Sequence, residues 1–349
     1  MDKNIEKRMY FALSIIFLAV FYFIFRMIFD VILDFIPLNE PVRIILTYLG
    51  HALMNISAAM IVFYFMNKSF LRLDEDDSAS EKESLSIKEK ADPSLKLLFQ
   101  GFTFKNFRSQ LKSALFLICV IYIPLDFFSY VIPLIFKLDV LEYQADALIS
   151  PESILGNYLL YDIGLMIIMT FIIHFFIALR EEFVFRGFYI YMGEKTVNKS
   201  TAFIFSAFLF GMAHFSYIFL PYEGASPIFY PFWWGFNGTV IGITSAYFYI
   251  SKKQLWPLIF AHWTNNVISA IILRRNMDGV PFWQETFLII YLPIFVFSIV
   301  FLVKYRKSLI IHIKGIFNFF KDYIIEIPNK AFFALDFALI IILWLMSLF

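Results

Sequence analysis

The sequence predicts an all-α fold, a polytopic transmembrane helical bundle of eight or nine helices, on three observations. Of its 349 residues 60% are hydrophobic and 47 are phenylalanine, and its mean hydropathy is +0.74, which excludes an ordinary soluble domain. It contains repeated apolar runs long enough, at about 20 residues, to cross a bilayer. These runs lack the alternation of a membrane β-barrel, and lipid offers no partner to unpaired backbone groups, so helices are the expected form.

The apolar runs give the candidate spans in chain order. They cover residues 9–36, 42–66, 112–136, 156–192, 199–220, 230–251, 255–273, 282–304 and 331–349. The first run is too long for a signal-peptide core and ends without a small-residue cleavage site, so we expect a retained membrane helix. The chain divides into amino-terminal helices over 1–150, a central helical core over 151–275 and carboxy-terminal helices over 276–349.

Two segments interrupt the apolar runs. Asp, Glu, Lys and Ser dominate a polar segment at about 67–111, most densely from Asp74 to Ser94, which is typical of a solvated loop. From Arg306 to Lys330, lysines mix with isoleucine and phenylalanine, which favours an interfacial amphipathic helix. We expect both segments to lie outside the hydrocarbon core.

The charged residues indicate orientation and exclude one class of partner. Lys3, Lys7 and Arg8 precede the first run, and Lys252 and Lys253 follow the sixth; such residues favour the cytoplasmic side. We therefore expect an integral, multi-pass protein with a cytoplasmic amino terminus, and the composition rich in Phe, Ile and Lys indicates a bacterial cell membrane. The 29 basic and 28 acidic residues give a net charge of +1, so nucleic acid is not an expected partner.

The only cysteine of the sequence, Cys119, lies within an apolar run. It has no second cysteine with which to form an intramolecular disulfide or a cysteine-based metal cluster. The compartment in which the protein folds is therefore not indicated by its cysteine content.

The fourth apolar run contains a charged motif where charge is costly. Glu182 and Arg186 are four residues apart on one helical face and are expected to form an ion pair. Glu181 points about 100° away and has no such local partner. Two carboxylates with unequal partners can serve as a base and as its electrostatic support, which makes Glu181 the candidate base. The alternative is that both acids lie at a helix end among lipid headgroups.

Two further runs carry histidine. His214 lies in the fifth run, and His262 and Asn266 lie one turn apart on the seventh. Each alone is compatible with packing or with hydrogen bonds that join helices. Together with Glu181 they supply a base, its orienter and an oxyanion clamp, which are the parts needed for amide hydrolysis.

Other polar residues within the runs are interpreted as structural. His174 lies near the face of Glu181, and we expect an interhelical contact, with a supporting role at the site as the alternative. Asp126, Asn237 and Asp336 are expected to join helices, and His51 and His312 to be incidental.

These motifs resemble those of a known family. In order, they are Glu181-Glu182-x-x-x-Arg186, Phe210-x-x-x-His214 and His262-x-x-x-Asn266. They are similar to the signature of the CPBP family, which contains CAAX prenyl endopeptidases of the Ras-converting type and bacteriocin self-immunity proteins. The resemblance covers about residues 156–275. It implies an intramembrane endopeptidase that acts on a membrane-associated or lipidated protein or peptide, with the lipid bilayer as its surroundings.

The resemblance also implies a role for each motif residue. Glu181 and His214 would activate the attacking water, and His262 and Asn266 would stabilise the oxyanion. Glu182 and Arg186 would position substrate or fix the site. A metal-free site is favoured because the sequence has no His-Glu-x-x-His motif; the alternative is zinc held by Glu181, His214 and His262.

Two other functions remain open at this point. One is a bacteriocin self-immunity or binding protein of the same fold that acts without proteolysis. The other is a transporter, in which buried carboxylates and histidines would relay protons.

Overall fold

The computed structural model describes residues 3–77, 106–136, 140–149, 157–219, 229–327 and 330–346. These residues form helices and short connections, with no strand among them, which confirms the predicted all-α class. The polar loop predicted at about 67–111 is wrong at both ends, because helices extend to Asp77 and begin again at Phe107. Polar residues can continue a helix beyond the hydrocarbon region, where water solvates them. The middle of that segment, 78–105, lies outside the described residues.

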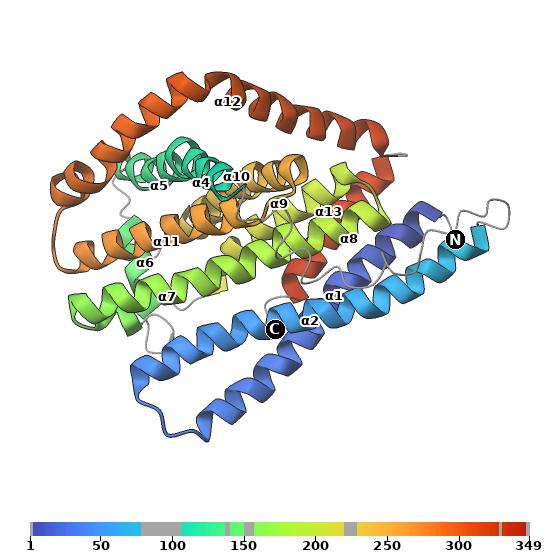
Figure 1. The fold of residues 1–349 in the computed structure, drawn as a ribbon, viewed down its shortest axis with the longest axis horizontal. Coiled ribbons are helices and arrows are strands. Elements are labelled where there is room, and N and C mark those ends of the chain that lie inside the picture. The colour runs from blue at the N-terminus through green and yellow to red at the C-terminus, as the bar shows by residue number, and fades with distance from the viewer. Residues whose placement is uncertain are drawn as a thin grey trace.

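The helices follow one another in a long series. They are α1 (Lys3–Asp34), α2 (Glu40–Asp77), α4 (Phe107–Phe116), η3 (Leu117–Tyr122), α5 (Ile123–Ile135), α6 (Val140–Ile149), η4 (Asn157–Leu160), α7 (Ile163–Glu182), η5 (Phe183–Tyr189), α8 (Ile190–Thr196), α9 (Lys199–Phe215), η6 (Ser216–Phe219), α10 (Phe229–Lys252), α11 (Trp256–Met277), η7 (Phe282–Tyr291), α12 (Leu292–Glu326) and α13 (Lys330–Met346). In Figure 1, α1 and α2 form a hairpin at one edge and α12 arches over the opposite edge. Helices α7, α9, α10 and α11 lie between them.

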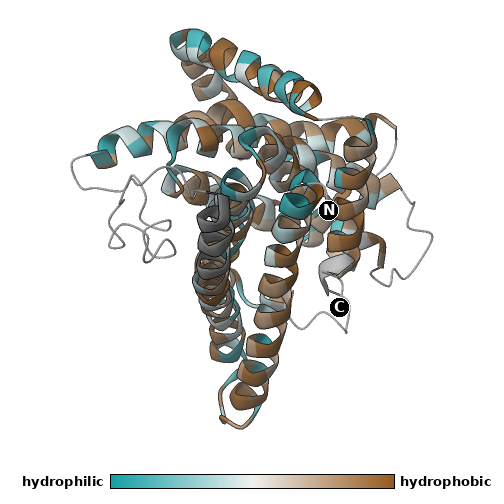
Figure 2. Cartoon of the chain, turned by 90° about the vertical axis from the view of Figure 1, so that its right-hand side faces the viewer, coloured by the Kyte–Doolittle hydropathy of each residue, from teal (hydrophilic) through white to brown (hydrophobic). Residues whose placement is uncertain are grey.

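Several helices are long and apolar enough to cross a membrane. Within the described residues there are five such stretches: Lys3–Asp34, Glu40–Met66, Phe107–Ile135, Ile163–Thr196 and Phe282–Glu326. They support an integral membrane protein, and Figure 2 shows hydrophobic residues along the α1–α2 hairpin and over much of the bundle.

The predicted total of eight or nine spans is not reached by this measure. Helices α9 and α13 have only 17 residues each, and α10 and α11 include Trp, Gly, Ser and Asn, which lower their hydropathy. The number of spans therefore stays a prediction.

One predicted boundary changes for a local reason, and another agrees with a kink in the structure. The run predicted over 156–192 begins as a helix only at Ile163, because the side chain of Asp162 caps α7 by accepting from the backbone N–H groups of Gly164 and Leu165. The separate helix predicted from Arg306 agrees with a kink in α12, because Tyr305 has a non-helical backbone (φ −110°, ψ 16°) and divides α12 into two helical parts. Whether its second half lies at the membrane surface stays a prediction.

Small residues allow α9 and α10 to pack closely. A Cβ added to Gly242 would lie 3.0 Å from the Cα atom of Ala207, and one added to Gly211 would lie 2.9 Å from the Cα atom of Thr239. Both contacts involve backbone, which cannot rotate away as a side chain can. Close approach of helices through small residues is the usual packing of membrane helices. It fixes the position of α9, which carries His214, relative to α10.

Replacing Gly242 with alanine is therefore expected to destabilise the bundle by about 1–3 kcal/mol, the usual cost of overpacking. The measurement is the free energy of unfolding in a mild-detergent titration. Gly164→Ala is the matched control, because its added Cβ would lie 3.4 Å from the nearest atom, a carboxylate oxygen of Asp162. Equal stability of the two variants would contradict the account of the α9–α10 contact.

Candidate active site

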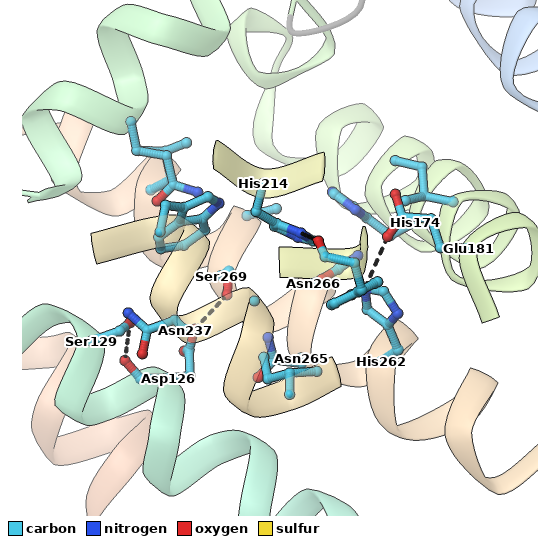
Figure 3. Close-up of a pocket in the computed structure, with 18 of the residues that line it drawn as sticks. Asp126, Ser129, His174, Glu181, His214, Asn237, His262, Asn265, Asn266 and Ser269 are labelled. Carbon is cyan, nitrogen blue, oxygen red and sulfur yellow. Dashed lines mark hydrogen bonds and ion pairs between the residues drawn. The ribbon is translucent and has the colours of Figure 1, made fainter. Parts of the chain in front are cut away.

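A cavity of about 330 Å³ lies within the bundle. Residues of α2, α5, α6, η4, α7, α9, α10 and α11 line it, and they include Glu181, His214, His262 and Asn266. Figure 3 shows these four side chains around the same space. The volume falls within the range of small-molecule and substrate pockets. The motif residues predicted from three separate helices are thus brought together.

Glu182, Arg186 and His262 form a buried group behind the cavity. Glu182 Oε1 lies 2.8 Å from His262 Nδ1, and Glu182 Oε2 lies 3.3 Å from Arg186 Nε, with both charged side chains fully buried. The predicted ion pair between Glu182 and Arg186 is present. The contact with His262 joins α7 to α11 and was not predicted. Because a carboxylate accepts, the Nδ1 atom of His262 carries the hydrogen and its Nε2 atom faces the cavity side.

Arg186 has a second kind of support. Its guanidinium carbon lies 4.0 Å from the centre of the Phe210 ring, a distance at which an aromatic face attracts a cation. Arg186 follows Glu182 within a π-helical turn, η5, a local form that occurs frequently at functional sites. The cation therefore connects η5 with α9 beside the site.

Glu181 faces the cavity and is one-fifth exposed. Its Oε1 atom lies 3.4 Å from an Arg180 Nη atom, and its Oε2 atom lies 3.7 Å from His262 Nε2. The prediction that Glu181 lacks a charged local partner is therefore wrong. Side chains of adjacent helical residues normally diverge, but the long side chain of Arg180 reaches back to the carboxylate. The two acids still differ, because only Glu182 is fully buried beside a fully buried cation.

His214 is held in one orientation by its own helix. Its Nδ1 atom lies 2.8 Å from the carbonyl oxygen of Phe210, so Nδ1 donates and Nε2 is left as an acceptor in the neutral ring. Gly238 of α10 packs against the ring, and a Cβ there would lie 3.0 Å from His214 Cγ. Backbone contacts thus fix the ring that the sequence identified as a candidate for activating water.

Asn266 lines the cavity one turn after His262 on α11, as the spacing predicted. Two other polar residues of α11, Asn265 and Ser269, line it as well. Neither was predicted to be a site residue. The signal that was available is their spacing of three and seven residues from His262, which continues one polar face of the helix.

His174 and Asp336 make the expected contacts between helices, whereas Asn237 donates to the Trp233 carbonyl oxygen within α10, and several of the residues interpreted as structural also line the cavity. His174 Nε2 lies 2.7 Å from the Tyr158 hydroxyl of η4, and Asp336 pairs with Arg8 across α13 and α1. His312 packs edge-on against Tyr247. The lining includes His174, His51, Asn237 and Asp126. Sequence patterns could not distinguish a polar side chain that joins helices from one that also faces a cavity.

Metal binding was left open by the sequence. Among the described residues, no group of three His, Cys, Asp or Glu side chains is close enough to hold a metal ion as it stands. His262 uses Nδ1 for Glu182, and His214 uses Nδ1 for Phe210. In a zinc site made by Glu181, His214 and His262, the carboxylate of Glu181 and the Nε2 atoms of the two histidines would have to converge on the metal.

Comparison with known families bears on this site. A family model described as type II CAAX prenyl endopeptidase, Rce1-like, matches residues 163–268. Residues 163–268 are thus similar to this family of CAAX-type intramembrane proteases. The Rce1-like segment contains every motif residue from Glu181 to Asn266 and lies inside the predicted central core of 151–275. No curated protein and no solved structure matches the chain.

The Rce1-like match and the apolar helices agree on the class of protein. The family is one of intramembrane CAAX-type proteases, and a lipid bilayer is the environment that such helices require. The match ends before the η7, α12 and α13 helices and begins after α1 to α6. Those helices still contribute His51 and Asp126 to the cavity around the Rce1-like segment.

Proposed function

We propose that this protein is an intramembrane endopeptidase that hydrolyses a peptide bond of a membrane-associated or lipidated substrate, without a resident metal. The observation that carries the proposal is the meeting of Glu181, His214, His262 and Asn266 around one cavity within apolar helices. These four side chains provide acceptors for a proton and donors for an oxyanion in the same space. The substrate's apolar or lipid part would lie in the bilayer, beside the α-helical walls.

In the proposed reaction, a water molecule lies between Glu181 and His214. Glu181 takes a proton from the water as the water oxygen attacks the carbonyl carbon. The Nε2 atom of His214 accepts a hydrogen bond from the second hydrogen of the water. The C–N bond then breaks, and the proton held by Glu181 passes to the leaving amine. The products are a carboxylic acid and an amine, so one water is consumed for each bond.

His262 and Asn266 would stabilise the oxyanion of the tetrahedral intermediate. Since Nδ1 of His262 donates to Glu182, its Nε2 atom would donate to the oxyanion when the ring carries a hydrogen on both nitrogens. Asn266 would donate its amide N–H from one turn further along α11. Glu182 and Arg186 are thus positioning residues, which hold His262 and do not touch the reacting atoms.

The zinc-dependent alternative makes a different demand on the same residues. Glu181, His214 and His262 would then hold the metal, and zinc would lower the pKa of its bound water so that hydroxide attacks. Glu182 would keep its role, because a ligating histidine is normally oriented by a carboxylate at its other nitrogen.

The test is cleavage of a library of quenched fluorescent peptides that carry a lipid or an apolar tail, by purified protein in bilayer discs. We expect cleavage with one ¹⁸O atom in the new carboxylate when the water is enriched in ¹⁸O. Activity should survive a zinc chelator. His214→Ala is expected to lower the rate by about 10²-fold, the lower end of the contribution from proton-transfer groups.

Other outcomes assign the protein differently. Loss of activity with chelator and its recovery with added zinc would replace the metal-free mechanism with the zinc-dependent one. No cleavage of any peptide, together with protection of cells from a membrane-active peptide by wild type and Glu181→Gln alike, would favour the immunity or binding function. Altered pH dependence of transport in Glu181→Gln would favour a transporter.

A further inference from the structure

The cavity has two polar ends. In Figure 3, Glu181, His174 and His262 lie toward one side, and Asp126 with its neighbours Ser129 and Ser269 lies toward the other. All of these residues line the same cavity. The proposed reaction uses only the first end. The second end therefore faces a part of the substrate that lies away from the bond to be cleaved.

Asp126 is the centre of the second end. It is only 6% exposed and accepts hydrogen bonds from two other elements, from Ser269 Oγ of α11 at 3.1 Å and from the Tyr291 hydroxyl of η7 at 2.6 Å. Each carboxylate oxygen thus receives one donor, and each has a further lone pair. Two donors from separate helices hold the carboxylate at the cavity wall in a fixed position.

The charges along the cavity leave Asp126 without a cation. Among the described residues that line it, Arg180 is the one Lys or Arg, and it faces Glu181 at the other end. A carboxylate within a membrane bundle is costly unless it is paired or solvated. A positively charged group of a ligand would supply the missing partner.

Asn265, which lies between His262 and Ser269 on α11, provides an independent indication of a ligand in the cavity. It is 8% exposed, lines the cavity one turn before Ser269, and its Oδ1 atom has no hydrogen-bond partner among the described residues. A buried amide oxygen left without a donor is unfavourable by about 1–3 kcal/mol. An ammonium or guanidinium group offers several donors, enough for both Asp126 and Asn265.

We propose that Asp126, Asn265 and Ser269 form a subsite for a lysine or arginine side chain of the substrate, a proposal that rests on the proposed peptidase function. Ser269 lies seven residues after His262 on α11, which is about 10 Å along the helix. An extended peptide covers that distance in about three residues. The cationic residue is therefore placed about three residues from the scissile bond.

The test is a series of lipid-tailed peptides that differ at one position, with lysine, norleucine or glutamate placed in turn two, three or four residues to either side of the bond. For wild type, kcat/KM is expected to be at least tenfold higher for lysine than for norleucine at one of these positions, and lowest for glutamate. Asp126→Asn should reduce the lysine-to-norleucine ratio at least tenfold, and Ser269→Ala should reduce it less. Asp336→Asn is the matched control, a buried aspartate paired with Arg8 elsewhere in the bundle, and should leave the ratio unchanged.

A ratio near one at every position in wild type, or an unchanged ratio in folded Asp126→Asn, would overturn the subsite. Binding of the same peptides with a fluorescent label to Glu181→Gln separates this from failure of the peptidase function. Tighter binding of the lysine peptide that depends on Asp126, with no cleavage by wild type, would overturn the peptidase and keep the subsite. Cleavage by wild type with equal binding of all three peptides would overturn the subsite and keep the peptidase function.

Discussion

Glu181→Gln is expected to lower the rate of peptide cleavage by about 10⁴-fold, the upper end of what a positioned general base contributes. Glutamine keeps the size and one hydrogen-bonding oxygen of the side chain but cannot take a proton from water. Glu181 faces the cavity, and glutamine occupies nearly the same volume, so the packing around it should be kept. We therefore expect a folded, inactive protein, measured by cleavage rate and by thermal unfolding in detergent.

The matched control is Glu194→Gln on α8. Glu194 pairs with Lys253 at 2.5 Å and lies outside the cavity, so the same chemical change there should leave cleavage within about twofold. If Glu181→Gln retained activity within tenfold of wild type while remaining folded, Glu181 would not be the base. His262 would then be the next candidate, because Glu182 orients its ring toward the cavity.

Local geometry explains which parts of the site the sequence could predict. The ion pair of Glu182 and Arg186 follows from a spacing of four residues on one helix, and so does the common face of His262 and Asn266. The contact between Glu182 and His262 joins residues 80 positions apart. It depends on how α7 and α11 are rotated and how closely they pack, and hydropathy does not encode either.

The same distinction holds for the fold. Apolar composition was sufficient to predict an all-α membrane protein, because lipid permits few other structures. It could not predict that α2 extends to Asp77, since this depends on whether a helix stops at the membrane surface. Nor could it predict that Gly238 would press against the His214 ring. Such contacts become visible only once the helices are placed in three dimensions.

Arg186→Met is expected to reduce the free energy of unfolding by about 3–5 kcal/mol, the usual effect of leaving a buried charge without its partner. Glu182 and Arg186 are both fully buried, and in the variant His262 is the remaining hydrogen-bond partner of the Glu182 carboxylate among the described residues. The loss of the cation from the Phe210 ring adds to the effect. The measurement is a detergent unfolding titration, together with the amount of protein that reaches the membrane.

A second substitution separates this charge effect from lost packing. Adding Glu182→Gln to Arg186→Met removes the uncompensated charge, so the double variant should be more stable than Arg186→Met alone, a non-additivity expected of residues in contact. It should remain poorly active, because His262 has then lost the carboxylate that orients its ring. Arg26→Met is the matched control, since Arg26 pairs with Asp30 on an exposed face of α1 and should cost less than about 1 kcal/mol. Equal losses for the single and double variants would show that Arg186 acts through packing, and that the buried charges of Glu182 and Arg186 do not hold the site together.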